Sequence, residues 1–109
     1  YKVIIHDRYH GDRPQFIGFN SLGTPVWINK AAAKADYRVA IGRICPHSDT
    51  GYEGEGKMIL LGICSMESVM HNHCMCCSPK TGLGTFDDNP RWKLYDMGNG
   101  VRETNVKRT

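Results

Sequence analysis

Three side chains that could take part in catalysis or ligand binding lie in one short stretch of the chain. His47 opens the stretch, Lys57 lies within it, and His73 closes it. The loop that leads to Lys57 contains Gly54 and Gly56. Histidine, with an unperturbed pKa of about 6.5, can give or take a proton near neutral pH. Lysine can bond covalently to a ligand, so the stretch indicates a ligand site more than a core.

The loop before Lys57 partly matches a phosphate-binding loop. Its sequence, Gly51-Tyr52-Glu53-Gly54-Glu55-Gly56-Lys57, has the GxxxxGK spacing. However, Met58 stands where that motif needs Ser or Thr for magnesium, and two glutamates place negative charge in the loop. We therefore favour glycines that let the backbone approach a flat ligand while Lys57 reaches it. A phosphate- or nucleotide-binding module remains an alternative.

A helix is expected to begin at Ser65, and its helical periodicity predicts that its two histidines lie on different faces. One face of this helix carries Met66, Val69, Met70, His73 and Cys77. His73 is therefore predicted to point inward with the apolar side chains, and His71 to point outward.

The cysteines next to His73 raise the question of a zinc site. Cys74, Cys76 and Cys77 lack the paired C-x-x-C spacing, and three such positions on one helix cannot face a single point. We interpret them as buried structural thiols. A non-catalytic metal-binding domain remains a second alternative.

Two apolar runs predict buried strands that end near histidines. Residues 2–6 and 37–44 are rich in Val and Ile. His6 ends the first run, and His47 follows the second. In open α/β sheets ligands bind at the C-terminal ends of the strands, which makes both histidines candidates for one site.

The remaining pattern completes an α/β reading. Residues 15–20 and 24–29 flank a turn and predict a hairpin. Asn29 is a good N-cap for a short helix over residues 30–35, and Ser65 for the second helix. The expected fold is part of a Rossmann-like layered domain with short strands, a hairpin and two helices.

Composition excludes several classes of protein. The 109 residues carry a net charge of +3 spread along the chain, without the basic face or stacking motif of a nucleic-acid-binding protein. No run is long enough to span a bilayer, and no signal peptide opens the sequence. Five cysteines with this spacing do not form a disulfide framework, so we expect a cytoplasmic protein. The first residue and the polar end predict a fragment.

Several motifs together resemble the nickel-dependent lactate racemase family. They are His6-Asp7, LGTPVWIN, RVAIGRI, PHSDTGYEGEGKMILLGICSMESVMHNH and SPKTGLGTFDDNPRW. The resemblance covers about residues 2–94 and places residues 1–94 in the later part of that family's N-terminal catalytic domain. Residues 95–109 no longer follow the pattern and are expected to be a divergent, poorly ordered tail.

The resemblance implies a 2-hydroxyacid racemase or epimerase, an isomerase with a nickel-pincer nucleotide cofactor. Lys57 would tether this pyridinium mononucleotide through a thioamide, with Gly54 and Gly56 beside it. His73 would bind the nickel ion. Other proteins would synthesise the cofactor.

The same resemblance implies that His6 and His47 are the two acid/base residues. The cofactor would take a hydride from the α-carbon of the substrate while one histidine takes the hydroxyl proton. The planar 2-keto acid could then receive the hydride on its other face. Because parts of that site would lie outside residues 1–94, we expect the isolated chain to be inactive.

Overall fold

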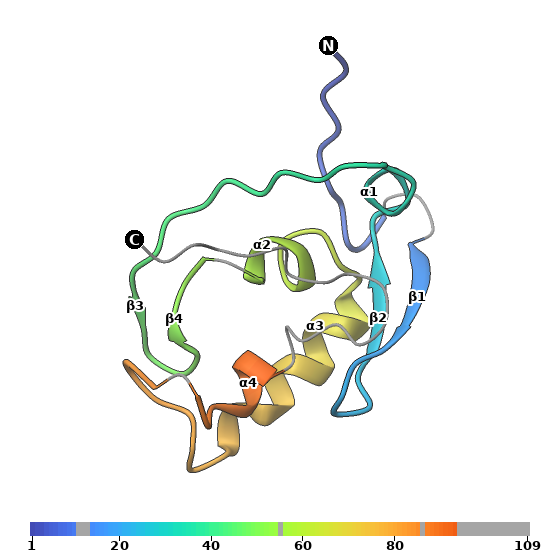
Figure 1. The fold of residues 1–109 in the computed structure, drawn as a ribbon. Helices are drawn as coiled ribbons and strands as arrows, with labels where there is room; N and C mark the ends of the chain where they lie inside the picture. The colour runs from blue at the N-terminus through green and yellow to red at the C-terminus, as the bar shows by residue number, and fades with distance from the viewer. Residues whose placement is uncertain (11–13, 55, 86, 94–109) are drawn as a thin grey trace.

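The structure is a computed structural model that describes residues 1–10, 14–54, 56–85 and 87–93. The described elements are β1 (Gln15–Phe19), β2 (Pro25–Ile28), α1 (Lys30–Ala33), β3 (Pro46–His47), β4 (Gly51–Tyr52), α2 (Lys57–Leu60), α3 (Met66–His73), the 3-10 turn η1 (Cys74–Cys77) and α4 (Pro90–Lys93) (Figure 1). The expected α/β class is confirmed. The tail predicted over residues 95–109 lies outside the described residues. Within those residues, no helix has the length and apolar character needed to cross a membrane.

The predicted hairpin is confirmed as the antiparallel pair β1 and β2. Its turn is organised by Asn20, whose side-chain oxygen accepts hydrogen bonds from the backbone N–H groups of Leu22 and Thr24 at 3.0 and 2.8 Å. Gly23 has a φ of +77°, a conformation that favours glycine. The turn sequence therefore fixes the register of the hairpin.

The second edge of β2 is also hydrogen-bonded. Asn29 N–H donates to the Ile63 carbonyl, and Ser65 N–H donates to the Trp27 carbonyl, both at 2.8 Å. Ile28 and Cys64 form an antiparallel bridge between these bonds. The segment that links α2 to α3 thus acts as a third strand beside the hairpin.

A small core forms where this segment meets the hairpin. Its buried apolar side chains are Val26, Ile28, Leu60, Cys64 and Val69. They come from β2, α2, α3 and the connection between the two helices, so burying them packs both helices against the hairpin.

Both predicted helix N-caps are confirmed. The Asn29 side chain accepts from the Ala31 and Ala32 N–H groups at the start of α1, and the Ser65 hydroxyl accepts from the Ser68 N–H at the start of α3. The sequence reading did not assign α2. Gly62 follows the end of α2, where its N–H donates to the Lys57 carbonyl at 2.8 Å.

The two predicted buried strands are wrong. Residues 2–6 and 37–44 form no strand, and both runs are largely exposed; the exposed fraction is 87% for Ile5 and 90% for Ile41. A strand needs a neighbour for its backbone hydrogen bonds, and no other described segment pairs with either run. In Figure 1 the second run crosses from α1 to β3 as an open trace.

The predicted inward face of α3 is only partly correct: Val69 is in the core and Met66 packs against it, but the inward direction predicted for His73 is wrong. The buried residues are Ser68, Val69 and Asn72, whereas Met70 and His73 are exposed. Polar side chains occupy the packed face because they find partners there: the Ser68 hydroxyl donates to the Pro25 carbonyl at 2.8 Å and accepts from the Trp27 N–H.

The structural role predicted for the clustered cysteines is likewise wrong. Cys74, Cys76 and Cys77 are exposed on the 3-10 turn that follows α3. The buried thiol is that of Cys64, which lies in the core. The apolar character of cysteine alone did not distinguish these positions.

The contrast between the core and the open runs can be tested with matched substitutions. Ile28→Val removes a methyl group from a side chain that is 1% exposed, and we expect it to lower the free energy of unfolding by about 0.5–1.5 kcal/mol. Ile41→Val makes the same change on an exposed side chain and should stay within about 0.5 kcal/mol of the original. Urea unfolding measures both. Equal losses would contradict the burial described here.

Candidate functional site

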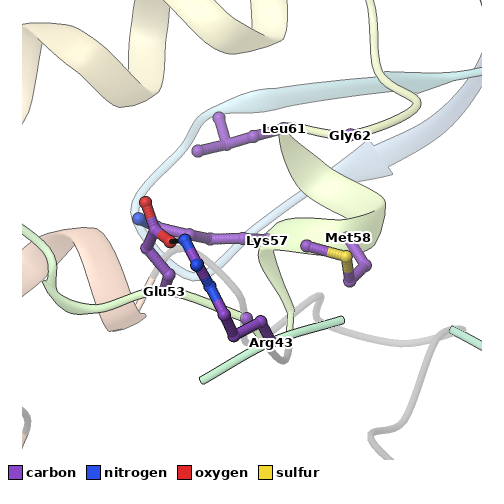
Figure 2. A pocket seen from close by; sticks show the side chains of 7 residues that line it. Arg43, Glu53, Lys57, Met58, Leu61 and Gly62 are labelled. Atoms are coloured by element: carbon purple, nitrogen blue, oxygen red, sulfur yellow. Dashed lines mark ion pairs between the residues drawn. The ribbon is translucent and has the colours of Figure 1, made fainter. Parts of the chain in front are cut away.

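Lys57 lies at the first turn of α2 with its side chain in a pocket. The pocket has a volume of about 430 Å³, and Arg43, Glu53, Gly54 and Leu61 also line it. Lys57 is only 9% exposed. Figure 2 shows its side chain extending toward the carboxylate of Glu53. The amine is thus held within a hollow and does not extend into open solvent.

Charges around the pocket act on the lysine in opposite directions. Burial lowers the pKa of Lys57, because the charged form loses hydration, while the negative charge of Glu53 raises it. The Glu53 carboxylate accepts a hydrogen bond from the Cys45 thiol at 2.9 Å and forms an ion pair with Arg43 at 3.5 Å. The pKa of Glu53 is lowered chiefly by the bond from Cys45. Glu53 is therefore a charged wall of the pocket.

His47 lies in the short strand β3, which pairs with β4 through His47 and Gly51. Burial lowers the pKa of His47, and the charges of Lys57, Arg91 and His73 act in the same direction. The negative charge of Glu53 acts in the opposite direction and raises the pKa of His47.

A polar network behind His47 was not anticipated from the sequence. One oxygen of Asp49 contacts Nδ1 of His47, and the other contacts the guanidinium of Arg91, which is 1% exposed. Nε and Nη2 of Arg91 donate to the side-chain oxygen of Asn72 at 3.1 and 2.8 Å. Nothing in the local pattern marks Arg91 as a partner of Asn72 and Asp49, because it lies 19 and 42 positions from them.

The side chain of Asn89 adds a further connection to the same turn. It donates to the Asp49 carbonyl and to the Thr85 hydroxyl, both at 2.9 Å, and it caps Arg91 by accepting from the Arg91 N–H at 2.9 Å. Asn89 is fully buried. The loop between η1 and α4 is thereby fixed against the β3–β4 turn.

His73 ends α3 with one ring nitrogen engaged. Nδ1 lies 2.7 Å from the Val69 carbonyl, so Nδ1 must carry the proton and donate it. In the neutral ring, Nε2 then bears the lone pair. A histidine oriented through its other nitrogen in this way is the usual arrangement of a metal ligand. The exposed position leaves room for a bound group.

His6 makes its hydrogen bonds elsewhere, at the junction of α1 and the segment before α3. Its Nε2 lies 2.9 Å from the Cys64 carbonyl and its Nδ1 lies 3.3 Å from the side-chain nitrogen of Asn29. Both contacts are satisfied if Nε2 donates and Nδ1 accepts. Either ring nitrogen must leave its partner before His6 can exchange a proton with a ligand.

The two glycines that are predicted to lie beside a ligand, Gly54 and Gly56, occupy different positions relative to the pocket. Gly54 lines the pocket and has a φ of +96°; a Cβ there would lie 2.7 Å from the Arg43 carbonyl oxygen. Glycine is thus required at 54 by the backbone and by the close approach of the Arg43 segment. Gly56 is the N-cap of α2, which begins at Lys57.

No three His, Cys, Asp or Glu side chains in the described ranges are arranged to hold a metal ion on their own. A metal at His73 would therefore need ligands from outside this set of side chains.

Comparison with known proteins identifies relatives of this arrangement. A sequence model of the family described as "Lactate racemase N-terminal domain" matches residues 1–84. The lactate racemase of Thermoanaerobacterium thermosaccharolyticum is 36% identical over 91 residues, and that of Lactiplantibacillus plantarum is 39% identical over 90 residues. These alignments cover 82% and 81% of this chain and 21% of each relative. The chain thus spans about a fifth of the length of these relatives.

The three-dimensional fold gives the same result. The solved structure of the lactate racemase apoprotein from T. thermosaccharolyticum superposes with a TM-score of 0.80 at 33% identity, covering 84% of this chain and 22% of that structure. Sequence and fold agree over most of the described residues, including those around Lys57. The chain belongs to the family of lactate racemase N-terminal domains.

Proposed function

We propose that this chain is the cofactor-attachment part of a 2-hydroxyacid racemase or epimerase, with lactate-like acids as the substrate class. The observation that carries the proposal is the buried amine of Lys57 in a pocket, in a chain of this family. The charges of Lys57 and His73 both act on His47. The relatives are named lactate racemases. Because the chain spans a fifth of their length, the remaining parts of such a site would come from outside it.

Lys57 suits the role of a covalent tether. An amine must lose its proton before it can act as a nucleophile, and burial in the pocket lowers the pKa of this one. Gly54 and Gly62 also line the pocket and add no side-chain bulk there. The pocket therefore offers a reactive amine and space for a group attached to it.

His73 suits the role of a nickel ligand. Its Nδ1–H is committed to the Val69 carbonyl, which fixes the ring and leaves Nε2 for a metal. Imidazole is a good ligand for nickel. A nickel ion at His73 would take its other ligands from the cofactor or from outside the described side chains.

The residues therefore fit a nickel-pincer nucleotide with Lys57 as its tether and His73 as the protein ligand. Such a cofactor, when bound, supplies a hydride acceptor that can return the hydride to either face of a planar keto acid. His47 would exchange the hydroxyl proton of the substrate through Nε2, which has no hydrogen-bond partner within the described residues. His6 would serve the opposite enantiomer after releasing Cys64 or Asn29.

The phosphate-binding alternative gains less support from the structure. The strand, loop and helix around Lys57 follow the order of a phosphate-binding loop, but α2 has only four residues and the Glu53 carboxylate lies in the pocket. A carboxylate there opposes a phosphate group by charge repulsion. The metal-binding alternative lacks a described cluster of three ligands.

The burial of Lys57 predicts how stability depends on pH. A folded-state pKa below the unfolded value of 10.5 means that the unfolded chain binds the proton more readily, so stability should rise as pH increases toward 10.5. Lys57→Met should abolish this rise and should be more stable than the original at neutral pH. Urea unfolding between pH 7 and 10 measures the difference.

Another group in the core titrates in the same range and has the opposite effect. Burial raises the pKa of Cys64 from 9.0 to about 11, so its contribution is lost as pH rises above 9.0. This loss is common to both proteins and cancels when the free energies of unfolding are subtracted. A difference between Lys57→Met and the original that does not change with pH would contradict the burial of the amine.

Cofactor attachment is tested by mass spectrometry. In the full-length protein of which this chain is proposed to be part, produced together with the cofactor-making proteins, the peptide containing Lys57 should carry the mass of the cofactor. Lys57→Arg should lose both this mass and the racemase activity, while Lys80→Arg on the exposed loop should keep both. An active enzyme with unmodified Lys57 would exclude the tether.

The histidines should separate into two groups in the same full-length protein. His47→Ala and His6→Ala should retain the cofactor but lower kcat for racemisation by about 10²–10⁴-fold, the usual contribution of a general acid or base. His73→Ala should lose nickel, measured by metal analysis, whereas His71→Ala should retain it. Nickel loss in His71→Ala alone would reverse the assignment of the ligand.

A further inference from the structure

The contacts of Asp49 connect three elements of the candidate site. Asp49 lies in the turn between β3 and β4, two residues after His47, and its carboxylate contacts both His47 and Arg91. Arg91 comes from α4 and is held by Asn72 of α3. The network therefore extends from His47 to the residue that precedes His73.

The proton on the His47 ring follows from the neighbours of Nδ1. The backbone N–H groups of Asp49 and Thr50 point at Nδ1, but at 3.3 and 3.4 Å they are long for hydrogen bonds. Oδ1 of Asp49 is buried and in ion-pair contact with Nδ1, and in the geometry shown it makes no hydrogen bond among the described residues. A buried carboxylate oxygen facing an imidazole lone pair would be repelled, whereas an Nδ1–H would satisfy it.

Arg91 fixes the carboxylate in this position. Its guanidinium is buried, contacts the second oxygen of Asp49, and donates twice to the Asn72 side-chain oxygen. A charge pair with one buried member resists separation, because breaking it would take the nearest opposite charge away from the buried guanidinium. The Asp49 carboxylate is thus prevented from rotating away from the histidine.

We propose that Asp49 is a positioning residue that holds the proton of His47 on Nδ1 and so presents the basic lone pair of Nε2 to a substrate. The catalytic role of Asp49 rests on the proposed function. The tautomer of the His47 ring depends only on contacts within this chain. Asp49 acts through His47 and does not touch the substrate. The arrangement has the logic of other carboxylate–histidine pairs, in which loss of the carboxylate leaves the ring in the wrong tautomer.

Two-bond ¹⁵N–¹H correlation spectra of the chain test the assignment directly. At a pH where the His47 ring is neutral, the original should have its proton on Nδ1. In Asp49→Asn, the N–H₂ group of the amide can turn toward Nδ1 and donate a hydrogen bond to it. Nδ1 must then carry the lone pair, so the ring proton should move to Nε2. Asp36→Asn, which makes the same change at an exposed position, should leave the His47 signals unchanged.

A second variant keeps the test valid if Asp49→Asn does not fold. That substitution leaves the buried charge of Arg91 without the Asp49 carboxylate. The double variant Asp49→Asn, Arg91→Gln removes that charge, and the glutamine amide can still donate to Asn72. It should also show the proton on Nε2. An Nε2 proton in the original, or an Nδ1 proton retained in a folded variant, would overturn the assignment.

Kinetics of the full-length enzyme then separate positioning from general stability. Asp49→Asn should lower kcat with little change in KM, because the substrate still binds but meets the wrong ring nitrogen, and Asp49→Glu should restore part of the rate. A rise in KM with unchanged kcat would overturn the positioning role. If the spectra show the expected tautomers but the original enzyme racemises no 2-hydroxyacid, the proposed function fails while the Asp49–His47 pairing stands.

Discussion

The rest of the structure depends on β2 being hydrogen-bonded along both edges. β1 pairs with one edge, and the segment around Cys64 pairs with the other through backbone bonds of 2.8 Å from Asn29 and Ser65. Because a two-stranded ribbon is only marginally stable alone, this third segment is what gives the hairpin a lasting partner. It also fixes where α2 ends and α3 begins. The positions of Lys57 and His73 follow from that single connection, since each residue lies on one of these two helices.

Local signals in the sequence were enough to predict the elements that depend on near neighbours. The turn of the hairpin and the caps at Asn29 and Ser65 depend on residues at most four positions apart, and the hairpin and both caps are confirmed. The predictions for residues 2–6 and 37–44 failed for the opposite reason. Both runs are rich in Val and Ile, as buried strands are, but burial requires a covering layer, and these runs have none among the described residues. A pattern can indicate that a segment is suited to a sheet without indicating that the sheet is present.

The residues of the candidate site also fall into two groups, those that the sequence could identify and those that it could not. His47, Lys57 and His73 could be selected as candidates from residue type and spacing, and in the structure the charges of Lys57 and His73 act on His47. The groups that tune them could not be selected. Glu53 looked unfavourable in a phosphate loop, yet it interacts electrostatically with Lys57 from the wall of the pocket. The inward direction assigned to His73 failed because Ser68 and Asn72, both polar, take the packed face through partners in β2 and α4.

The exposed apolar runs have a consequence for how the chain behaves in concentrated solution. Residues such as Ile5, Val39 and Ile41 are largely solvent-exposed, and the backbone beside them has no strand to bond with among the described residues. Segments of this kind are templates for edge-to-edge pairing between molecules. Self-association should therefore begin at these two runs. A charged residue introduced into either run should raise the concentration at which self-association begins. The segments least involved in the fold of the single chain would then set the limit to its solubility.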